Sequence, residues 1–341
     1  MKIKSILFTI LMGMIGAETY AYDFEVNKIQ YTIISFDDLT VSVVGLNESV
    51  SKIVEIPSNV EYKNKIFSVT SIGRAFYEKD NIEKVIIQNG VNIIETAAFY
   101  KCTSLKEIVL PNSLNIIKDY AFYNCRSLKE INIPDNVTSL WENVFQNCTS
   151  LRSAYISKKI GVLPEYTFQD CINLTSINWN YTQEESYNED YQNVTGVIYM
   201  EAFRGCSSLK TLIIPSGVGY VRGGFSGCAS LDSLIIEDGD YQLSIEIAAS
   251  PIEDTIKNIY LGRYYRYKYD YDGYYPPFTQ VKHLVVGNKV YNVPYFFGKL
   301  ETLTLGTSIM KIGDLSKQLS LQYIKLHCNN PPEAVEFSKN T

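Results

Sequence analysis

The chain has 341 residues, of which 46% are apolar, and its formal net charge is −6. It is long enough to bury a large core, and its lysines are spread along the chain without the basic stripe typical of a nucleic-acid-binding protein. Its only two histidines are His283 and His327, which argues against metal binding and general-base catalysis, because histidine is the residue most often used for both.

Residues 1–21 have the pattern of a signal peptide. Lys2 and Lys4 precede an apolar run at residues 6–16, and Thr19-Tyr20-Ala21 places small residues where signal peptidase reads them. A membrane anchor is the alternative, but the run has about half of the ~20 residues that span a bilayer. We therefore expect cleavage after Ala21 and an exported protein, at the cell surface, in the periplasm or secreted. No later stretch has the length of a transmembrane segment.

Residues 22–50 are expected to form a β-hairpin. Tyr31 and Ile33 alternate with polar residues before the acidic pair Asp37-Asp38, and Val41 and Val43 do so after it. A repeat array exposes an apolar face at its first turn and needs a cap there. We predict that this hairpin is the cap.

A 23-residue motif then repeats along the chain. Residues 105–127 read LKEIVLPNSLNIIKDYAFYNCRS, residues 128–150 read LKEINIPDNVTSLWENVFQNCTS, and residues 151–173 read LRSAYISKKIGVLPEYTFQDCIN. A longer turn at 51–81 precedes the regular ones, an insertion at 180–194 lengthens a later turn, and looser turns follow. A fixed period in this range predicts a solenoid, in which each turn covers its neighbour.

Each residue of a turn can be given a position. Leu105 and Ile108 point inward, Glu107 and Val109 point outward, and Pro111 ends the strand because it cannot donate to a strand ladder. A second short strand follows, and the Ala-Phe pair begins a helical turn. The phenylalanines of successive turns are predicted to stack in one internal column, namely Phe76, Phe99, Phe122, Phe145, Phe168, Phe203 and Phe225.

The pattern LxxIxIPxxVxxIxxxAFxxCxS resembles the BspA-type leucine-rich repeat (LRR) family, which is common in Bacteroidetes and some mucosal protists. The resemblance is strong from residue 51 to about residue 230 and weak over 255–330. It implies a repeat solenoid, a right-handed leucine-rich-repeat coil of about eleven turns of 19–35 residues, with short parallel strands and helical or 3-10 turns. Members are exported or surface proteins, and the better-studied ones look like adhesins for host extracellular matrix or for other bacteria.

We therefore divide the chain into a signal peptide at 1–21, a β-hairpin cap at 22–50 and a solenoid at 51–341. The insertion at 180–194, a Tyr-rich loop at 263–278 and the irregular C-terminal turns depart from the family pattern. Because repeat arrays are reused for many partners, these departures leave the ligand open.

Six of the seven cysteines share one position, three residues after the stacked phenylalanine. Disulfides between neighbouring turns, a metal ladder and plain packing are the three interpretations, and export would permit the first. None of these cysteines has a CxxC partner or a nearby histidine. We favour reduced cysteines that pack as small apolar side chains. The six are Cys102, Cys125, Cys148, Cys171, Cys206 and Cys228, and the seventh is Cys328.

The outward strand positions form a candidate binding face. Exposed apolar and tyrosine side chains in a line would make an interaction surface, although β-branched residues also simply favour strands. The predicted binding residues on this face are Tyr155, Ile213, Ile235 and Tyr260. The full middle outward position reads Ile86, Val109, Asn132, Tyr155, Asn178, Ile213, Ile235, Tyr260, Val285, Thr304 and Lys325.

The segment 263–278, RYYRYKYDYDGYYPPF, is the second candidate site. Its charged residues alternate with tyrosines, which suggests a hairpin or an extended loop, and tyrosine gives broad amphipathic contact at low entropy cost. The alternative is a loop that folds back and packs its own rings. The candidate residues are Tyr264, Tyr265, Tyr267, Tyr269, Tyr271, Tyr274 and Tyr275.

Three functional hypotheses follow. The first is an exported, non-catalytic binding protein, a cell-surface adhesin or interaction module that contacts host or bacterial proteins or glycans through the strand face and the Tyr-rich loop. The second is a structural or self-associating envelope scaffold. The third is an enzyme of unrecognised type, but the chain carries no GxSxG, HExxH or P-loop motif. We expect no catalytic residues, no metal, no cofactor and no nucleic-acid partner.

Overall fold

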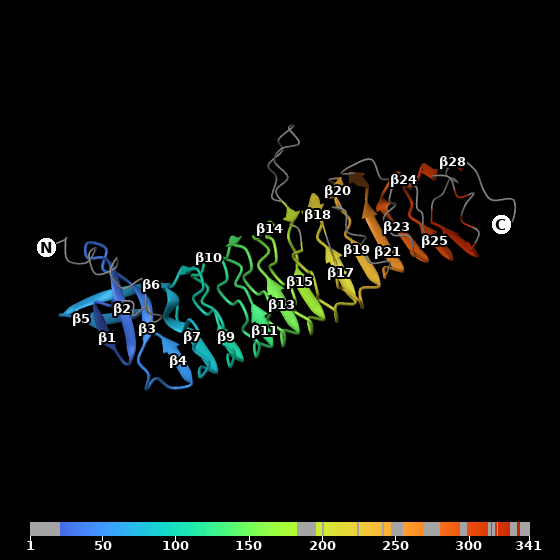
Figure 1. Cartoon of the computed structure of the whole chain (residues 1–341). Coiled ribbons are helices and arrows are strands. Elements are labelled where there is room, and N and C mark those ends of the chain that lie inside the picture. The colour runs from blue at the N-terminus through green and yellow to red at the C-terminus, as the bar shows by residue number, and fades with distance from the viewer. Residues whose placement is uncertain are drawn as a thin grey trace.

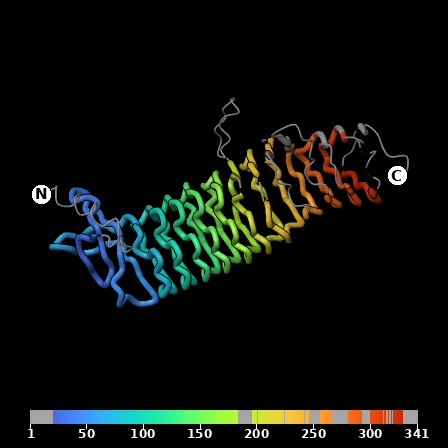
Figure 2. Tube along the Cα trace, in the orientation of Figure 1, coloured from blue at the N-terminus to red at the C-terminus, as the bar shows by residue number. Residues whose placement is uncertain are grey.

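The computed structural model describes residues 21–182, 196–199, 201–223, 225–240, 242–246, 255–268, 280–293, 299–312, 315, 318, 320–327 and 333–334. These residues form one elongated coil, with the N-terminal strands at one end and the C-terminal strands at the other (Figures 1 and 2). The predicted repeat solenoid is confirmed. Two ladders of parallel strands run along its length.

The first ladder contains the LxxIxI strands. Its members pair in parallel, each with the equivalent strand of the next turn, in runs of three, three and six strands. The strands are β4 (Ile53–Ile56), β7 (Lys84–Ile87), β9 (Glu107–Val109), β11 (Glu130–Asn132), β13 (Ser153–Ile156), β15 (Ser176–Trp179), β17 (Thr211–Ile214), β19 (Ser233–Ile236), β21 (Asn258–Arg263), β23 (His283–Lys289), β25 (Thr302–Leu305) and β27 (Tyr323–Leu326).

The second ladder is formed by the shorter strands that follow the turn residues. It stays in register across the predicted insertion, because Val162 pairs with Val197 and Leu163 with Ile198. Most of that insertion lies outside the described residues. The strands are β8 (Ile93–Ile94), β10 (Ile116–Ile117), β12 (Ser139–Leu140), β14 (Val162–Leu163), β16 (Val197–Ile198), β18 (Tyr220–Arg222), β20 (Leu243–Glu246), β22 (Tyr265–Lys268), β24 (Asn292–Val293), β26 (Lys311–Ile312) and β28 (Glu333–Ala334).

The N-terminal end is closed by antiparallel strands. The hairpin predicted around Asp37-Asp38 is present as β2 (Ile29–Ser35) and β3 (Thr40–Leu46), with β1 (Phe24–Val26) paired to β2. β3 then pairs in parallel with β6 (Lys65–Ile72), which also pairs antiparallel with β5 (Asn59–Tyr62) and continues into the second ladder at β8. The cap is therefore an extension of that ladder.

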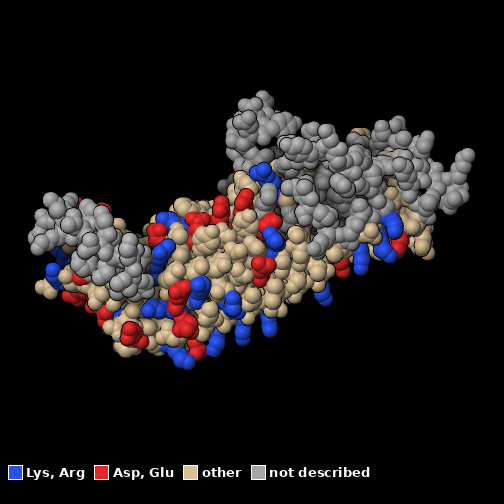
Figure 3. Space-filling view, viewed as in Figure 1, with Lys and Arg blue, Asp and Glu red and all other residues tan. Residues whose placement is uncertain are grey.

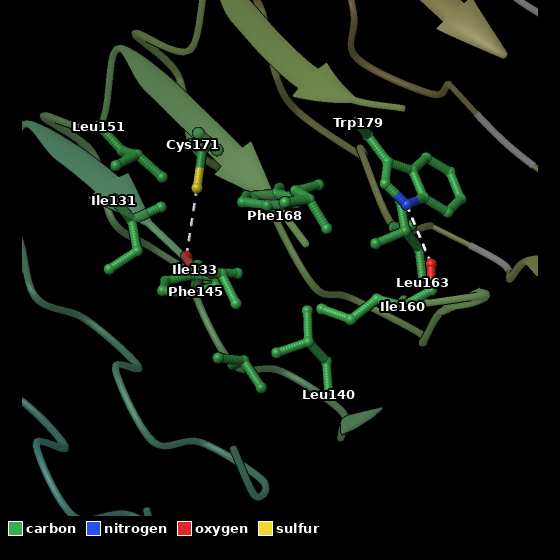
Figure 4. Packing of buried hydrophobic residues seen from close by; sticks show 14 of the residues in the cluster. Ile131, Ile133, Leu140, Phe145, Leu151, Ile160, Leu163, Phe168, Cys171 and Trp179 are labelled. Atoms are coloured by element: carbon green, nitrogen blue, oxygen red, sulfur yellow. Dashed lines mark hydrogen bonds between the residues drawn. The ribbon is translucent and has the colours of Figure 1, made fainter. Parts of the chain in front are cut away.

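The core is one continuous hydrophobic column. The six rings from Phe76 to Phe203 stack on their neighbours with centroid separations of 4.6–5.9 Å, and Phe225 is buried at the next position. Figure 4 shows Phe145 and Phe168 among the leucine and isoleucine side chains of adjacent turns, with Trp179 donating from Nε1 to the carbonyl of Ile160 at 3.0 Å. No turn buries its ring without its neighbours, as the repeat period predicted.

The Ala-Phe segment forms a 3-10 helix only at Arg74–Phe76 among the described turns, so the helical turns predicted for the later repeats are wrong. Alternate N–H groups there leave the local turn: those of Tyr120, Phe122 and Asn124 donate to carbonyls of the next turn at 2.8–3.1 Å. Tyr120 and Asn124 also have positive φ. A helix needs all its N–H groups for local bonds, so inter-turn bonding replaces it.

The six cysteines of the repeat are buried and reduced. Each donates to the carbonyl of the stacked phenylalanine one turn earlier, as Cys171 does to Phe145 at 3.1 Å (Figure 4), over a range of 2.8–3.1 Å. Burial raises the pKa of Cys102 to about 12 and also raises the pKa of Cys206, so the reactive thiolate is suppressed. Cys328 lies outside the described residues.

Candidate functional site

The first ladder brings most of the predicted strand-face residues into one line. Ile213 is paired with Ile235, Ile235 with Tyr260, and Tyr260 with Val285. Ile213 and Val285 are 41% and 39% exposed, and the two residues between them are half-buried. Side chains on one face of neighbouring strands lie about 5 Å apart. These four residues therefore form a continuous strip, which we name the apolar strip.

Tyr155 does not belong to the apolar strip. It lies between Asn132 and Asn178 in the register, so amide side chains separate it from the apolar residues on both sides. Its hydroxyl donates to Asp135 Oδ1 at 3.1 Å, and this hydrogen bond raises its pKa. The outward line read from the sequence already contained these two asparagines, and they divide its apolar residues into separate groups. Ile86 and Val109 form a second, shorter apolar pair on the N-terminal side.

Tyr260 is held in place within the apolar strip, between Ile235 and Val285. Its hydroxyl donates to Asp238 Oδ1 at 2.9 Å, and partial burial together with this hydrogen bond raises its pKa. Gly287 lies beside the same hydroxyl, and a Cβ at that position would come within 2.9 Å of the tyrosine oxygen. The ring is therefore fixed against the strand surface with its polar tip paired, as an amphipathic contact residue requires.

The start of the Tyr-rich segment differs from the predicted loop. Tyr265 and Tyr267 lie on β22 and pair in register with Leu243 and Ile245 of β20, so this part is a rung of the second ladder. Tyr264 precedes it and is 44% exposed. The period-2 alternation that we interpreted as a loop or hairpin is consistent with this strand. Tyr269, Tyr271, Tyr274 and Tyr275 lie outside the described residues.

Arg263, which opens the predicted Tyr-rich loop, is the end of β21 and is 1% exposed. It donates through its terminal nitrogens to the carbonyls of Pro215 and Ser216. Burial lowers its pKa to about 10. Arg263 thus ties the end of one turn to the backbone two turns earlier. Gly239, in the turn between them, leaves room for the arginine side chain.

A tyrosine stack that we did not predict lies beside the phenylalanine column. Tyr77, Tyr100 and Tyr123 directly follow the stacked phenylalanines, and their ring centroids are 5.0 and 4.9 Å apart. Tyr120 meets Tyr123 edge to face at 5.8 Å and is exposed. The signal in the sequence was the tripeptide Ala-Phe-Tyr in three consecutive turns. Because each ring covers its neighbour, we interpret the stack as packing of tyrosine side chains at the surface and not as a binding site.

A half-open cleft of about 640 Å³ separates the cap from the first turns. It is lined by residues of the β1–β2 turn, of β4, of β5 and of the connection between them, among them Asn27, Glu55 and Glu61. Gln88 closes one side through a 2.7 Å hydrogen bond from Nε2 to Glu55. Within the described part of the chain, no three His, Cys, Asp or Glu side chains are grouped so that they could hold a metal ion.

Comparison with known proteins gives a family match. The family described as "BspA type Leucine rich repeat region" matches residues 70–197 and 188–249 in six copies, which together span more than half of the chain. No curated protein matches at a significant level.

Several solved structures are similar to this chain. A leucine rich cell surface protein from Faecalibacterium prausnitzii is 18% identical over 91% of this chain and 96% of its own, with a TM-score of 0.53. A leucine-rich repeat protein from Bacteroides ovatus is 20% identical over 89% of this chain and 91% of its own, with a TM-score of 0.39. The T. pallidum leucine rich repeat protein is 22% identical over 65% of this chain and 85% of its own, with a TM-score of 0.45.

Proposed function

Since the chain belongs to the BspA-type leucine-rich repeat family, we propose that it is an exported, non-catalytic binding protein that presents the face of its first ladder to a protein or glycan partner. Export is supported by the signal-peptide pattern of residues 1–21 and by similarity to a cell surface protein of Faecalibacterium prausnitzii. Within the described residues, no helix has the length and apolar character needed to cross a bilayer.

The apolar strip is the observation that carries this proposal. Ile213, Ile235, Tyr260 and Val285 line up on four adjacent strands, and their register is continuous. Exposed apolar surface of this kind is costly in water and usually marks a contact surface. Tyr260 adds an aromatic ring whose hydroxyl is already paired with Asp238, so a partner can cover the ring without leaving that hydroxyl unsatisfied.

Substitution of the apolar strip tests the proposal. The variant Ile213→Thr/Ile235→Thr/Tyr260→Thr places β-branched threonine, which favours strands, at all three positions while removing apolar contact area. We expect it to lose at least tenfold in affinity for whichever immobilised matrix protein, mucin or bacterial surface the native protein binds saturably. The control is Val162→Thr, an exposed position on β14 of the second ladder. Equal binding by all three proteins, or no saturable binding by the native one, contradicts the proposal.

One observation favours the self-associating scaffold as a second candidate. On β27, Ile324 and Leu326 are 39% and 47% exposed, whereas their register partners on β25, Leu303 and Leu305, are almost fully buried. Within the described part of the chain β27 is the last strand of its sheet, and an edge strand with exposed apolar side chains is a template for pairing with another chain. Light scattering separates the candidates, because the scaffold requires concentration-dependent association that Ile324→Lys/Leu326→Lys abolishes, whereas the binding protein stays monomeric.

A further inference from the structure

Stacking brings cations that are dispersed in the sequence into one line. The residue just before each strand of the first ladder lies directly beside its equivalent in the next turn: Arg152 N–H donates to the carbonyl of Lys129 at 2.8 Å, and Thr175 N–H donates to that of Arg152 at 3.0 Å. Lys210 occupies the same position before β17, which packs beside β15. Figure 3 shows Lys and Arg side chains at intervals along one long edge of the molecule.

The middle of this line differs from its two ends. Towards the N-terminus, Glu83 lies between Lys52 and Lys106 and pairs with both, at 2.9 and 2.7 Å. Towards the C-terminus, Lys282 pairs with Glu301 at 2.7 Å. Lys52 and Lys106 thus share one carboxylate within the line, and Lys282 has a carboxylate of its own. Lys257, which stands between Asp232 and Lys282, forms no ion pair with any described residue.

Lys129, Arg152 and Lys210, which we name the basic row, are not paired in this way. Asp232 follows Lys210 in the line, where its N–H donates to the carbonyl of Lys210 at 3.0 Å, but its Oδ1 accepts from the hydroxyl of Ser233 at 2.8 Å. The three cations of the basic row are exposed, and none forms an ion pair with any residue that the structure describes. Only Thr175 stands between Arg152 and Lys210 in the order of turns. Like charges on neighbouring turns repel one another and contribute nothing to stability, so this arrangement is better explained by an external anion.

The column beside the basic row indicates what kind of anion. The first residues of β13, β15 and β17 are Ser153, Ser176 and Thr211, which pair or pack side by side. Hydroxyl groups donate to and accept from sugar hydroxyls and anionic oxygens, whereas binding of single-stranded nucleic acid normally uses aromatic rings on which bases stack. Glu130 begins this column next to Lys129 and makes no ion pair with it.

We propose that the basic row and its hydroxyl column bind a linear anionic polysaccharide that carries sulfate or carboxylate groups. One turn advances about 4.8 Å, so the three cations offer binding points along roughly 14 Å of an extended chain. The assignment rests on the proposed function, because the basic row borders the face of the first ladder. It names the class of ligand that this face would bind. Association by such a row releases counterions and is weakened by salt.

Chromatography on immobilised heparin tests the assignment with the full mature chain. The native protein is expected to be retained at 50 mM NaCl and released by salt, and Lys129→Gln/Arg152→Gln/Lys210→Gln should bind heparin at least tenfold more weakly. The matched control, Lys63→Gln/Lys158→Gln/Lys325→Gln, removes the same charge away from the row and should elute with the native protein. Glutamine keeps the aliphatic stem, and circular dichroism checks that both variants fold.

Three results would overturn the assignment. They are no retention of the native protein, equal elution of the two variants, and retention on single-stranded DNA-cellulose as strong as on heparin. The two variants separate this proposal from the proposed function. If the apolar-strip variant loses partner binding but is retained on heparin like the native protein, the basic row still functions. If the variant of the basic row loses heparin retention but still binds the partner, the apolar strip still functions.

Discussion

Single residues in the Ala-Phe segment decide how each turn is closed. In six consecutive turns two residues four positions apart have left-handed backbone, for example Asn143 and Asn147 at φ 60° and 61°. The second of the two directly precedes the repeat cysteine and is mostly Asn, Asp or Gly, the residues that tolerate this conformation best. The signal was therefore present in the sequence as Asn-Cys, Asp-Cys and Gly-Cys, and we did not use it.

Gly227 gives a prediction at this scale. Its φ is +76°, and an added Cβ would meet only the backbone of Gly205, at 3.1 Å. Gly227→Ala should lower the free energy of unfolding by about 1–2 kcal/mol, the cost of left-handed backbone for a side-chain-bearing residue. Gly227→Asn adds the same Cβ but tolerates the conformation, so it should cost less. Urea denaturation measures both, and equal losses would show that crowding rather than backbone conformation governs the site.

At the scale of the strand, charge pairs between turns tie adjacent rungs together. Glu83 accepts from Lys52 and Lys106, and these bonds lower its pKa to about 2. The side chain of Glu83 lies at the surface and is 32% exposed, so the contribution of these ion pairs to stability is small and screened by salt. Two other pairs, Lys84 with Glu107 and Lys118 with Glu95, span neighbouring turns in the same way.

The pH dependence of Glu83 follows from that shift. The pKa of Glu83 is lower in the folded chain than in the unfolded chain. The ionised carboxylate therefore stabilises the fold above pH ~4.5, and this contribution is lost as the pH falls towards about 2. The difference in urea midpoint between the native protein and Glu83→Gln should therefore be largest at neutral pH and vanish near pH 2. Glu130→Gln, which removes a carboxylate without an ion pair among the described residues, is the control. A difference that does not change with pH would contradict the assignment.

At the scale of the whole molecule, stability is shared between neighbouring turns. Phe145 stacks on Phe122 and Phe168 at 5.4 Å on both sides, and its carbonyl accepts the thiol of Cys171. An array of this kind behaves as a line of units coupled only to their neighbours. Damage in the middle should therefore weaken both halves.

Phe145→Ala tests this coupling. The cavity should cost about 3–5 kcal/mol, and hydrogen exchange measured by mass spectrometry should accelerate most in the adjacent turns and progressively less with distance. Ile172→Ala, at an exposed loop position of a neighbouring turn, should change little. Uniform acceleration along the whole chain would show global rather than nearest-neighbour cooperativity.

The sequence by itself determined the repeat, the inward column of Phe, Leu and Cys, and the N-terminal hairpin, because each is a periodic apolar pattern that has one way to be buried. The order of the outward line, with Asn132 and Asn178 in it, also follows from the repeat period. Only the tertiary structure decided how the segments outside the regular period are placed: it put Tyr265–Lys268 in the second ladder and brought Arg263 to the carbonyls of Pro215 and Ser216. It also aligned Lys129, Arg152 and Lys210, because side chains separated by twenty or more residues meet only when the turns are laid on one another.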